Sequence, residues 1–186
     1  MRSAREGVAA LRLALIAHGG TVAQAMHEHP VGELDAPGPA QVAADGPRCA
    51  SDPGEYELLL EMIFEGSCLH YGQPRLIDCP DSDLALLVGD QLYAMGLTAL
   101  ARLGDLDAVA ELADVISLVA QAHLGSNPAL GDAVWDAGAV AIGWGVTDAH
   151  RAAKELARTQ RPEALSAMRA AARGPLVDSA GGWSGS

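Results

Sequence analysis

The sequence predicts an all-α protein built as an antiparallel helical bundle, and two observations carry this prediction. Hydrophobic residues make up 49% of the 186 residues, yet there are only three Trp, three Tyr and one Phe. A chain rich in alanine and leucine favours closely packed helices over a sheet rich in branched and aromatic residues. Apolar residues also recur at three- and four-residue spacing, which is the helical period. The length suits one domain with a sizeable core.

The chain divides into four segments by composition. Residues 1–28 are predicted to form an N-terminal helix that can kink at Gly19–Gly20, whereas residues 29–54 hold five prolines without sustained periodicity. We expect that second segment to be a flexible loop or linker, because it has no aromatic residue to anchor it. Residues 55–175 form the expected helical core, and residues 176–186 a disordered tail.

The stretch 81–104 has the strongest helical pattern in the sequence. Asp81 can cap its first N–H groups, and Gly104 can supply the left-handed residue that ends it. Apolar residues surround most of it, so we expect it to be the core helix, with a helix over 105–123 antiparallel to it. Asp90 shares a face with leucines, which predicts a buried structural acid that accepts hydrogen bonds from a neighbouring helix.

The charge balance excludes some partners. The chain has 24 acidic and 12 basic residues, a formal charge of −12 that repels a phosphate backbone and an anionic membrane surface alike. We therefore expect no nucleic acid partner. No stretch reaches the roughly eighteen uninterrupted apolar residues of a membrane helix, so no integral membrane segment is expected. Three cysteines without paired spacing, and a first segment without a signal-peptide pattern, favour the cytoplasm.

Three short runs in the middle of the chain carry a resemblance to a known family. GQP at 72–74 is followed by LVGDQL at 87–92 and then by LGD at 103–105. In this order and spacing they resemble trans-isoprenyl diphosphate synthases, in which a DDxxD helix is followed by an RRGxP connector, an LxGDxLxxxA helix and LGD. The resemblance implies a shortened isoprenoid-synthase-like fold, with Gly72 and Pro74 in the connector motif.

The departures from the family pattern concern its metal site. The aspartates of DDxxD correspond here to Glu61, Met62 and Glu65, and the arginines of RRG to His70 and Tyr71. The family chemistry needs carboxylates that hold magnesium and cations that hold the diphosphate. Glu61 and Glu65 are thus a degenerate first aspartate-rich motif, and no second DDxxD follows. No Gly-rich phosphate loop, GxSxG or HExxH is present either, so we expect no catalytic residue, metal or cofactor.

A chain with these features resembles the small, non-catalytic subunit of heterodimeric hexaprenyl and heptaprenyl diphosphate synthases. The resemblance implies a pseudoenzyme of isoprenoid biosynthesis that helps its catalytic partner to set product chain length. We expect a dimer, with a full-length polyprenyl diphosphate synthase or with itself. Ala94 and Ala101 leave notches on the helix over 81–104 where another backbone can approach closely, and they are the expected interface.

Two alternatives remain open at this level. A divergent active prenyltransferase would use Glu61 and Glu65, four apart on one helix face, as a magnesium pair; the competing interpretation is an exposed acidic face. A self-associating helical protein without a prenyl ligand would need only the apolar helix faces. The sequence does not give product chain length, partner identity, or the choice between homodimer and heterodimer.

Overall fold

The computed structural model describes the backbone of residues 1–180 and the side chains of residues 1–173. Within these residues the chain is helical, with an isolated bridge between Met26 and Ile77 and no strand. The all-α prediction is therefore confirmed. The elements are α1 (Ala4–His18), α2 (Gly20–Gln24), α3 (Pro39–Ala44), the 3-10 turn η1 (Pro47–Cys49), α4 (Pro53–Tyr71), α5 (Ser82–Leu103), α6 (Leu106–Leu124), α7 (Pro128–Trp144), α8 (Asp148–Arg158) and α9 (Ala164–Ala180).

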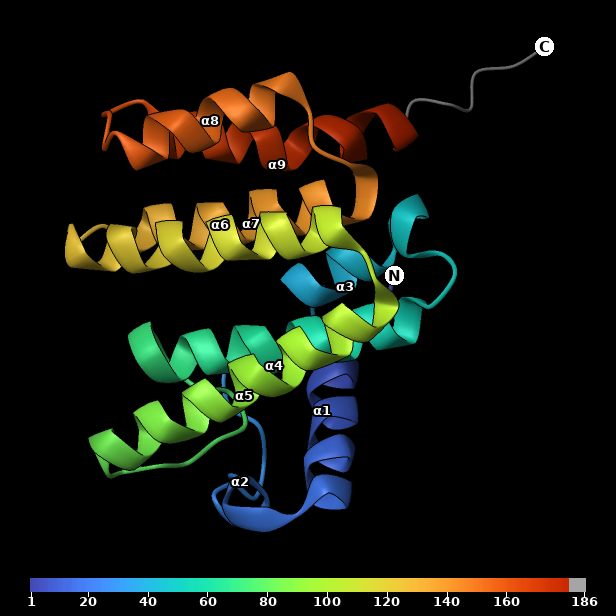
Figure 1. Cartoon of the computed structure of the whole chain (residues 1–186), viewed down its shortest axis with the longest axis vertical. Coiled ribbons are helices and arrows are strands. Elements are labelled where there is room, and N and C mark those ends of the chain that lie inside the picture. The colour runs from blue at the N-terminus through green and yellow to red at the C-terminus, as the bar shows by residue number, and fades with distance from the viewer. Residues whose placement is uncertain (181–186) are drawn as a thin grey trace.

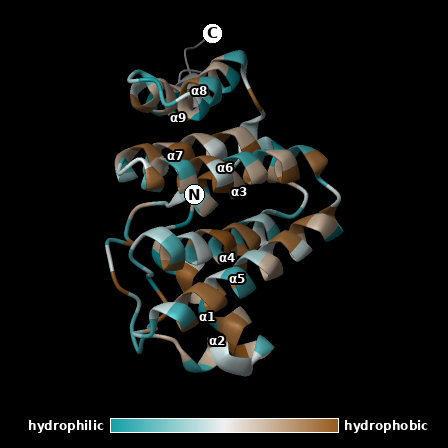
Figure 2. Cartoon of the chain, turned by 60° about the vertical axis from the view of Figure 1, so that its left-hand side comes forward, coloured by the Kyte–Doolittle hydropathy of each residue, from teal (hydrophilic) through white to brown (hydrophobic). Residues whose placement is uncertain are grey.

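The long helices lie in successive layers (Figure 1). α8 and α9 form one end of the molecule, α6 and α7 the next layer, α4 and α5 the layer after that, and α1 and α2 the other end. The short α3 packs against both α4 and α7 and so joins two layers. Hydrophobic stretches run along α4, α5 and α7 (Figure 2), and the core extends through the stack rather than around one helix.

The most deeply buried long helix in the described part of the chain is α7. Twelve of its 17 residues are buried, against five of 22 in α5. The expectation that 81–104 forms the core helix is therefore wrong. α5 packs mainly on α4, and the small residues on its inner side, among them Gly89 and Gly96, let the two backbones approach closely. α6 packs chiefly on α7, so the expected antiparallel pair of α5 and α6 is only a minor contact.

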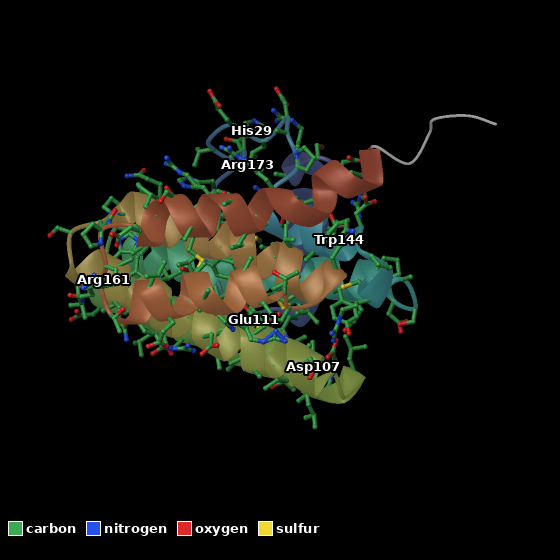
Figure 3. All side chains as sticks on the ribbon, turned by 90° about the horizontal axis from the view of Figure 1, so that it is seen from above. His29, Asp107, Glu111, Trp144, Arg161 and Arg173 are labelled. Carbon is green, nitrogen blue, oxygen red and sulfur yellow. The ribbon has the colours of Figure 1, made fainter. Side chains whose placement is uncertain are left out.

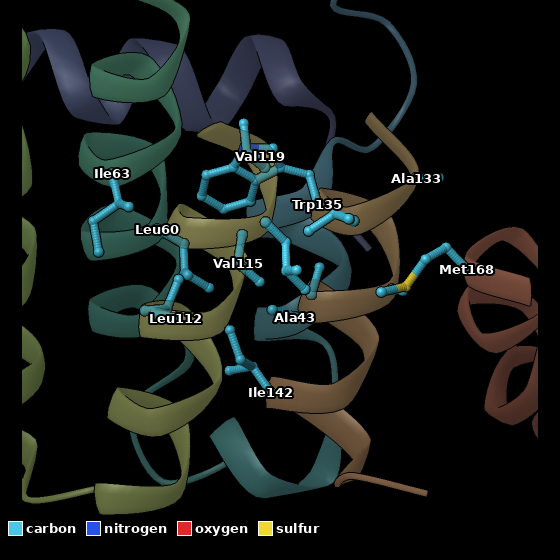
Figure 4. Close-up of a cluster of buried hydrophobic side chains, with 14 of the residues drawn as sticks. Ala43, Leu60, Ile63, Leu112, Val115, Val119, Ala133, Trp135, Ile142 and Met168 are labelled. Carbon is cyan, nitrogen blue, oxygen red and sulfur yellow. The ribbon is translucent and has the colours of Figure 1, made fainter. Parts of the chain in front are cut away.

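Side chains from three layers meet around Trp135 of α7 (Figure 4). Its ring stands edge-on to Phe64 with centroids 5.0 Å apart, and its indole N–H donates to Ser67 Oγ at 3.2 Å. This pairing satisfies the one polar atom of the indole inside the core. The cluster also includes residues of α4, α6, α7 and α9, namely Leu60, Ile63, Leu112, Val115, Ile142 and Met168.

The segment 29–54 is more ordered than its composition predicts. Residues 39–44 form α3 and residues 47–49 form η1, and Ala40, Gln41 and Ala43 are buried. The expected flexible linker is thus wrong for this part. Small residues replace aromatic anchors here, because a Cβ at Gly46 would lie 2.4 Å from Gly143 Cα and only a bare backbone fits so close.

The remaining boundaries follow local chemistry. The first helix breaks at Gly19–Gly20, where both residues have positive φ, so the predicted kink becomes a division into α1 and α2. Asp81 caps α5 by accepting from two backbone N–H groups, and Gly104 ends it in the left-handed region, both as predicted. α9 continues to Ala180, into the predicted tail, and the remainder of that tail, 181–186, lies outside the described residues.

Candidate functional site: the carboxylate row of α4

Three glutamates lie four residues apart on one face of α4, and all three are buried. Glu57, Glu61 and Glu65 are 5%, 1% and 0% exposed. Neither the exposed acidic face nor an open metal pair describes them, so both interpretations of Glu61 and Glu65 need correction. Carboxylates inside a protein need cations or hydrogen-bond donors to replace their water. The partners of this row come from three separate segments of the chain.

Arg75, in the connector between α4 and α5, is the main cation of the row. One guanidinium nitrogen lies 2.6 Å from Glu61 Oε2, and its Nε lies 3.2 Å from Glu65 Oε2. The guanidinium also stacks over Phe64, 4.6 Å from the ring centroid. Burial alone would lower the pKa of Arg75, but the charges of Glu61 and Glu65 outweigh it and raise the pKa. Arg75 therefore stays charged, as a buried ion pair requires.

Glu65 also fixes the course of the connector. Its Oε1 accepts backbone N–H groups of Arg75, Leu76 and Ile77 at 2.9, 2.7 and 3.0 Å. Three donors on one carboxylate oxygen hold this short segment against α4, where the predicted connector residues Gly72 and Pro74 precede it. The resemblance motif thus lies where the chain turns from α4 to α5.

The other end of the row is tied to α3 and the N-terminus. Gln41 Nε2 donates to Glu61 Oε1 at 2.7 Å and to Glu57 Oε1 at 3.0 Å. Arg2 donates to Glu57 Oε2 at 2.8 Å. Gly7 leaves room for these side-chain ends, because a Cβ there would lie 2.1 Å from Gln41 Nε2 and 2.5 Å from Glu61 Oε1 and would displace them.

The arrangement leaves no free oxygen for magnesium on the two glutamates. Both oxygens of Glu61 accept from Gln41 and Arg75, and both of Glu65 accept from Arg75 or the connector backbone. Magnesium demands a near-octahedral set of oxygen ligands, most of them water. In the described part of the chain, no group of three or more His, Cys, Asp and Glu side chains is arranged to hold a metal ion. The row is an internal ion-pair network.

Asp90 does not lie where the sequence placed it. Its side chain is 68% exposed, so the prediction of a buried acid is wrong. Its neighbour across the helix pair is His70 of α4, whose Nε2 lies 3.0 Å from Asp90 Oδ1 without the alignment of a hydrogen bond. The His70 ring stacks on Tyr93 with centroids 5.3 Å apart. The leucines expected to surround Asp90 point outward with it, because α5 lies at the edge of the bundle.

The outward face of α5 is apolar apart from Asp90, and it is uncovered. Leu84, Leu86 and Leu87 are 37%, 43% and 65% exposed, and the predicted interface residues Ala94 and Ala101 are exposed as well. α5 is long and apolar enough to cross a bilayer, with a mean hydropathy of 1.5 and 28% of that window buried. Core helices of soluble proteins meet the same criterion, so hydropathy alone assigns no membrane role.

A second buried ion-pair network joins α6 to α8. Glu111 accepts from Lys154 Nζ at 2.6 Å and lies 2.7 Å from His150 Nε2, while Asp114 accepts from Lys154 at 2.7 Å and also from Arg158. Burial by itself would raise the pKa of Glu111, but the hydrogen bonds from His150 and Lys154 outweigh it and lower that pKa. These contacts stabilise the packing of two layers.

A groove of about 520 Å³, with several charged residues in its lining, opens beside this second network. Figure 3 labels Glu111 and Asp107 on its α6 side. Most of its charged side chains already form ion pairs, so the groove has no excess charge that would attract a charged ligand. Its lining consists of Arg48, Asp107, Ala110, Glu111, Asp114, Gly145, Val146, Arg151 and Lys154.

Sequence reasoning identified Glu61 and Glu65 but not their partners, and it did not single out Glu57 or Glu111. Arg75 and Gln41 approach α4 from loops and a short helix, and nothing in their local pattern marks them. One signal was available for Arg75, a single arginine directly after the GQP run and within reach of glutamates at helical spacing. No such signal exists for Lys154, which lies far along the chain from Glu111.

Comparisons with known proteins do not identify a family. No family model matches the chain, and neither the curated proteins nor the solved structures give a match. The resemblance to isoprenyl diphosphate synthases therefore stays a prediction that rests on the residues of α4 to α6 and their connectors. The isoprenoid-synthase-like fold also stays a prediction, since only the all-α class is shown.

Proposed function

We propose that the chain is a non-catalytic subunit of a polyprenyl diphosphate synthase, which helps to set product length by packing its helices beside a catalytic partner. The sequence resemblance across α4, α5 and α6 motivates the proposal. The observation that supports a non-catalytic role is the ion pairing of Glu61 and Glu65 with Arg75, at the position that the resemblance assigns to DDxxD.

The chemistry explains why this observation matters. Prenyl transfer ionises an allylic diphosphate, so it needs carboxylates that hold magnesium and cations that hold the diphosphate. Here the nearest cation neutralises the carboxylates instead, and a bound metal would have to displace it. The divergent-enzyme alternative therefore has little to support it, whereas a subunit that works by packing needs neither group.

Two measurements test the proposal. The purified chain should not condense isopentenyl diphosphate with allylic diphosphates in the presence of magnesium. Co-expression with a full-length polyprenyl synthase from the same source should give a stable complex whose product length differs from that of the synthase alone. Magnesium-dependent product that Glu61→Ala or Glu65→Ala abolishes would promote the divergent-enzyme alternative.

Contact residues can be tested in the same complex. The predicted interface positions Ala94 and Ala101 are exposed on α5, so replacing either by Glu should weaken the complex without unfolding the chain. Leu124→Glu, at the far end of α6 and 86% exposed in the wild type, serves as the control and should leave the complex intact. A chain that stays unbound with every such synthase would refute the subunit role.

The self-associating helical protein remains the second candidate function. The specific observation in its favour is the exposed apolar face of α5, which needs a cover whether or not a synthase exists.

A further inference from the structure

We propose that the exposed face of α5 binds the same face of a second copy of this chain, with the two helices antiparallel. The inference uses only the α5 face and requires no prenyl synthase, although a synthase that binds the same face would compete with the second copy. It is carried by three properties of the face: its exposure, its gradient of side-chain size and its gradient of charge.

The size gradient makes the face complementary to itself. In the N-terminal half, Leu84, Leu86 and Leu87 project into solvent. In the C-terminal half the exposed residues before Arg102 are small, namely Ala94, Thr98 and Ala101. An antiparallel two-fold pair sets the leucines of each chain against the small residues of the other, whereas a parallel pair sets leucine against leucine. The centre of such a pair lies near Ala94, where the backbones can approach closely.

Thr98 fits an apolar contact better than its residue type suggests. Its hydroxyl donates to the carbonyl oxygen of Ala94 at 2.6 Å, one turn earlier in the same helix. The hydroxyl therefore has its hydrogen bond before any partner arrives, and covering the side chain leaves no donor unpaired.

The charge gradient favours the same orientation. α5 begins with Asp81 and Asp83 and ends with Arg102, so its two ends have opposite charge. These groups lie nearly the whole 22-residue helix apart, about 30 Å at 1.5 Å per residue, and cannot pair within one chain. In an antiparallel dimer the acidic end of each helix lies beside Arg102 of the other, and the helix dipoles oppose favourably. A parallel dimer would bring acid to acid.

The first experiment measures association of the full chain by sedimentation velocity over about 1–100 μM, a range that brackets micromolar dissociation constants. We expect a reversible dimer. Leu87→Glu places a charge in the proposed contact and should weaken the dimer by about tenfold or more. Leu124→Glu is the matched control, since that leucine is also exposed but lies at the end of α6. A monomeric wild type, or equal weakening by both variants, would overturn the proposal.

The second experiment tests the orientation by charge exchange. Asp83→Arg and Arg102→Asp should each weaken the dimer by about threefold to tenfold, the range expected for exposed ion pairs lost in duplicate. The double variant should recover the wild-type dissociation constant, because the exchanged charges again meet across the interface. Circular dichroism checks that each variant keeps its helical content. Failure of the double variant to recover, with its fold intact, would rule out the antiparallel arrangement.

Other occupants of the face give distinct results. Wild-type chain that stays monomeric but binds phosphatidylcholine vesicles would replace the second copy by a lipid surface. A monomer that forms a complex only with a prenyl synthase would overturn this inference and leave the proposed function standing. A dimer that no synthase dissociates or binds would support the inference and count against the proposed function.

Discussion

α4 and α5 are neighbouring helices, but α4 buries charged side chains whereas α5 exposes apolar ones. Comparing them shows what governs burial in this chain. α4 buries three glutamates at four-residue spacing, whereas α5 exposes leucines along its outer face. Helical periodicity identifies which residues share a face. It does not identify what covers that face. The cover of the glutamates on α4 is polar and comes from α3, the N-terminus and the connector, whereas the outer side of α5 is exposed.

The largest expected effect tests the polar cover of α4. Arg75→Met removes the cation and leaves Glu61 and Glu65 buried with reduced compensation, which costs about 3–5 kcal/mol of the free energy of unfolding. Urea titration followed by circular dichroism measures it. Arg161→Met, at an exposed position between α8 and α9, is the control and should change stability by less than about 0.5 kcal/mol.

A double variant sharpens that prediction. Arg75→Met combined with Glu61→Gln removes one uncompensated charge together with the cation, so it should recover part of the lost stability. If Arg75→Met alone proves as stable as the wild type, the carboxylates of α4 reach water in solution. The contrast between the two helices would then disappear.

The second prediction concerns pH and the network of Glu111. The pKa of this carboxyl is lower in the folded chain than in the unfolded chain, where it is about 4.3. Its contribution to stability is therefore present above pH 4.3 and is lost as the pH falls through the folded value. Glu111→Gln should lower stability at pH 7 by about 2–3 kcal/mol and flatten the decline below pH 5. Parallel stability curves of wild type and variant from pH 7 to pH 3 would contradict this assignment.

The third prediction concerns the inner side of α5. A Cβ at Gly96 would lie 2.5 Å from Ile63 Cγ1 and 2.7 Å from the carbonyl oxygen of Leu59. Backbone atoms cannot move aside as a flexible side chain can, so Gly96→Ala should destabilise the chain by about 1–3 kcal/mol despite its better helix propensity. Gly54→Ala is the control, since a Cβ there meets nothing within 4 Å. Equal melting temperatures for the two variants would show that α4 and α5 are not in close contact.

The sequence was sufficient for features set by local chemistry. Helix ends at Asp81 and Gly104 were predicted because capping depends on residues within one turn. The break at Gly19–Gly20 has the same local origin. The order of α3 was not predicted, because it depends on backbone contact between Gly46 and Gly143, which are far apart in sequence.

The candidate site was predicted only in part for the same reason. The spacing of Glu61 and Glu65 on one helix face was evident, but their burial depends on Arg75 and Gln41, whose positions are fixed by tertiary packing. The hydrophobic pattern of 81–104 was also evident, and it was assigned to the core because an apolar helix usually lies there. The pattern alone does not distinguish a core helix from an edge helix that a partner covers.

The smallest expected effect tests whether α5 is a core helix or a helix with an exposed outer face. A buried Asp90, as the sequence predicts, would make Asp90→Leu cost about 1–3 kcal/mol by leaving its donors unpaired. With its side chain 68% exposed and no aligned hydrogen bond to its neighbour His70, the same change should cost less than about 1 kcal/mol, as for other surface substitutions. Urea titration should be run at the lowest practical concentration and again at high concentration. A loss above about 2 kcal/mol in dilute solution would mean that Asp90 is buried within one chain. A loss that grows with concentration would instead place Asp90 in the contact between copies, because only the dimer would then depend on it.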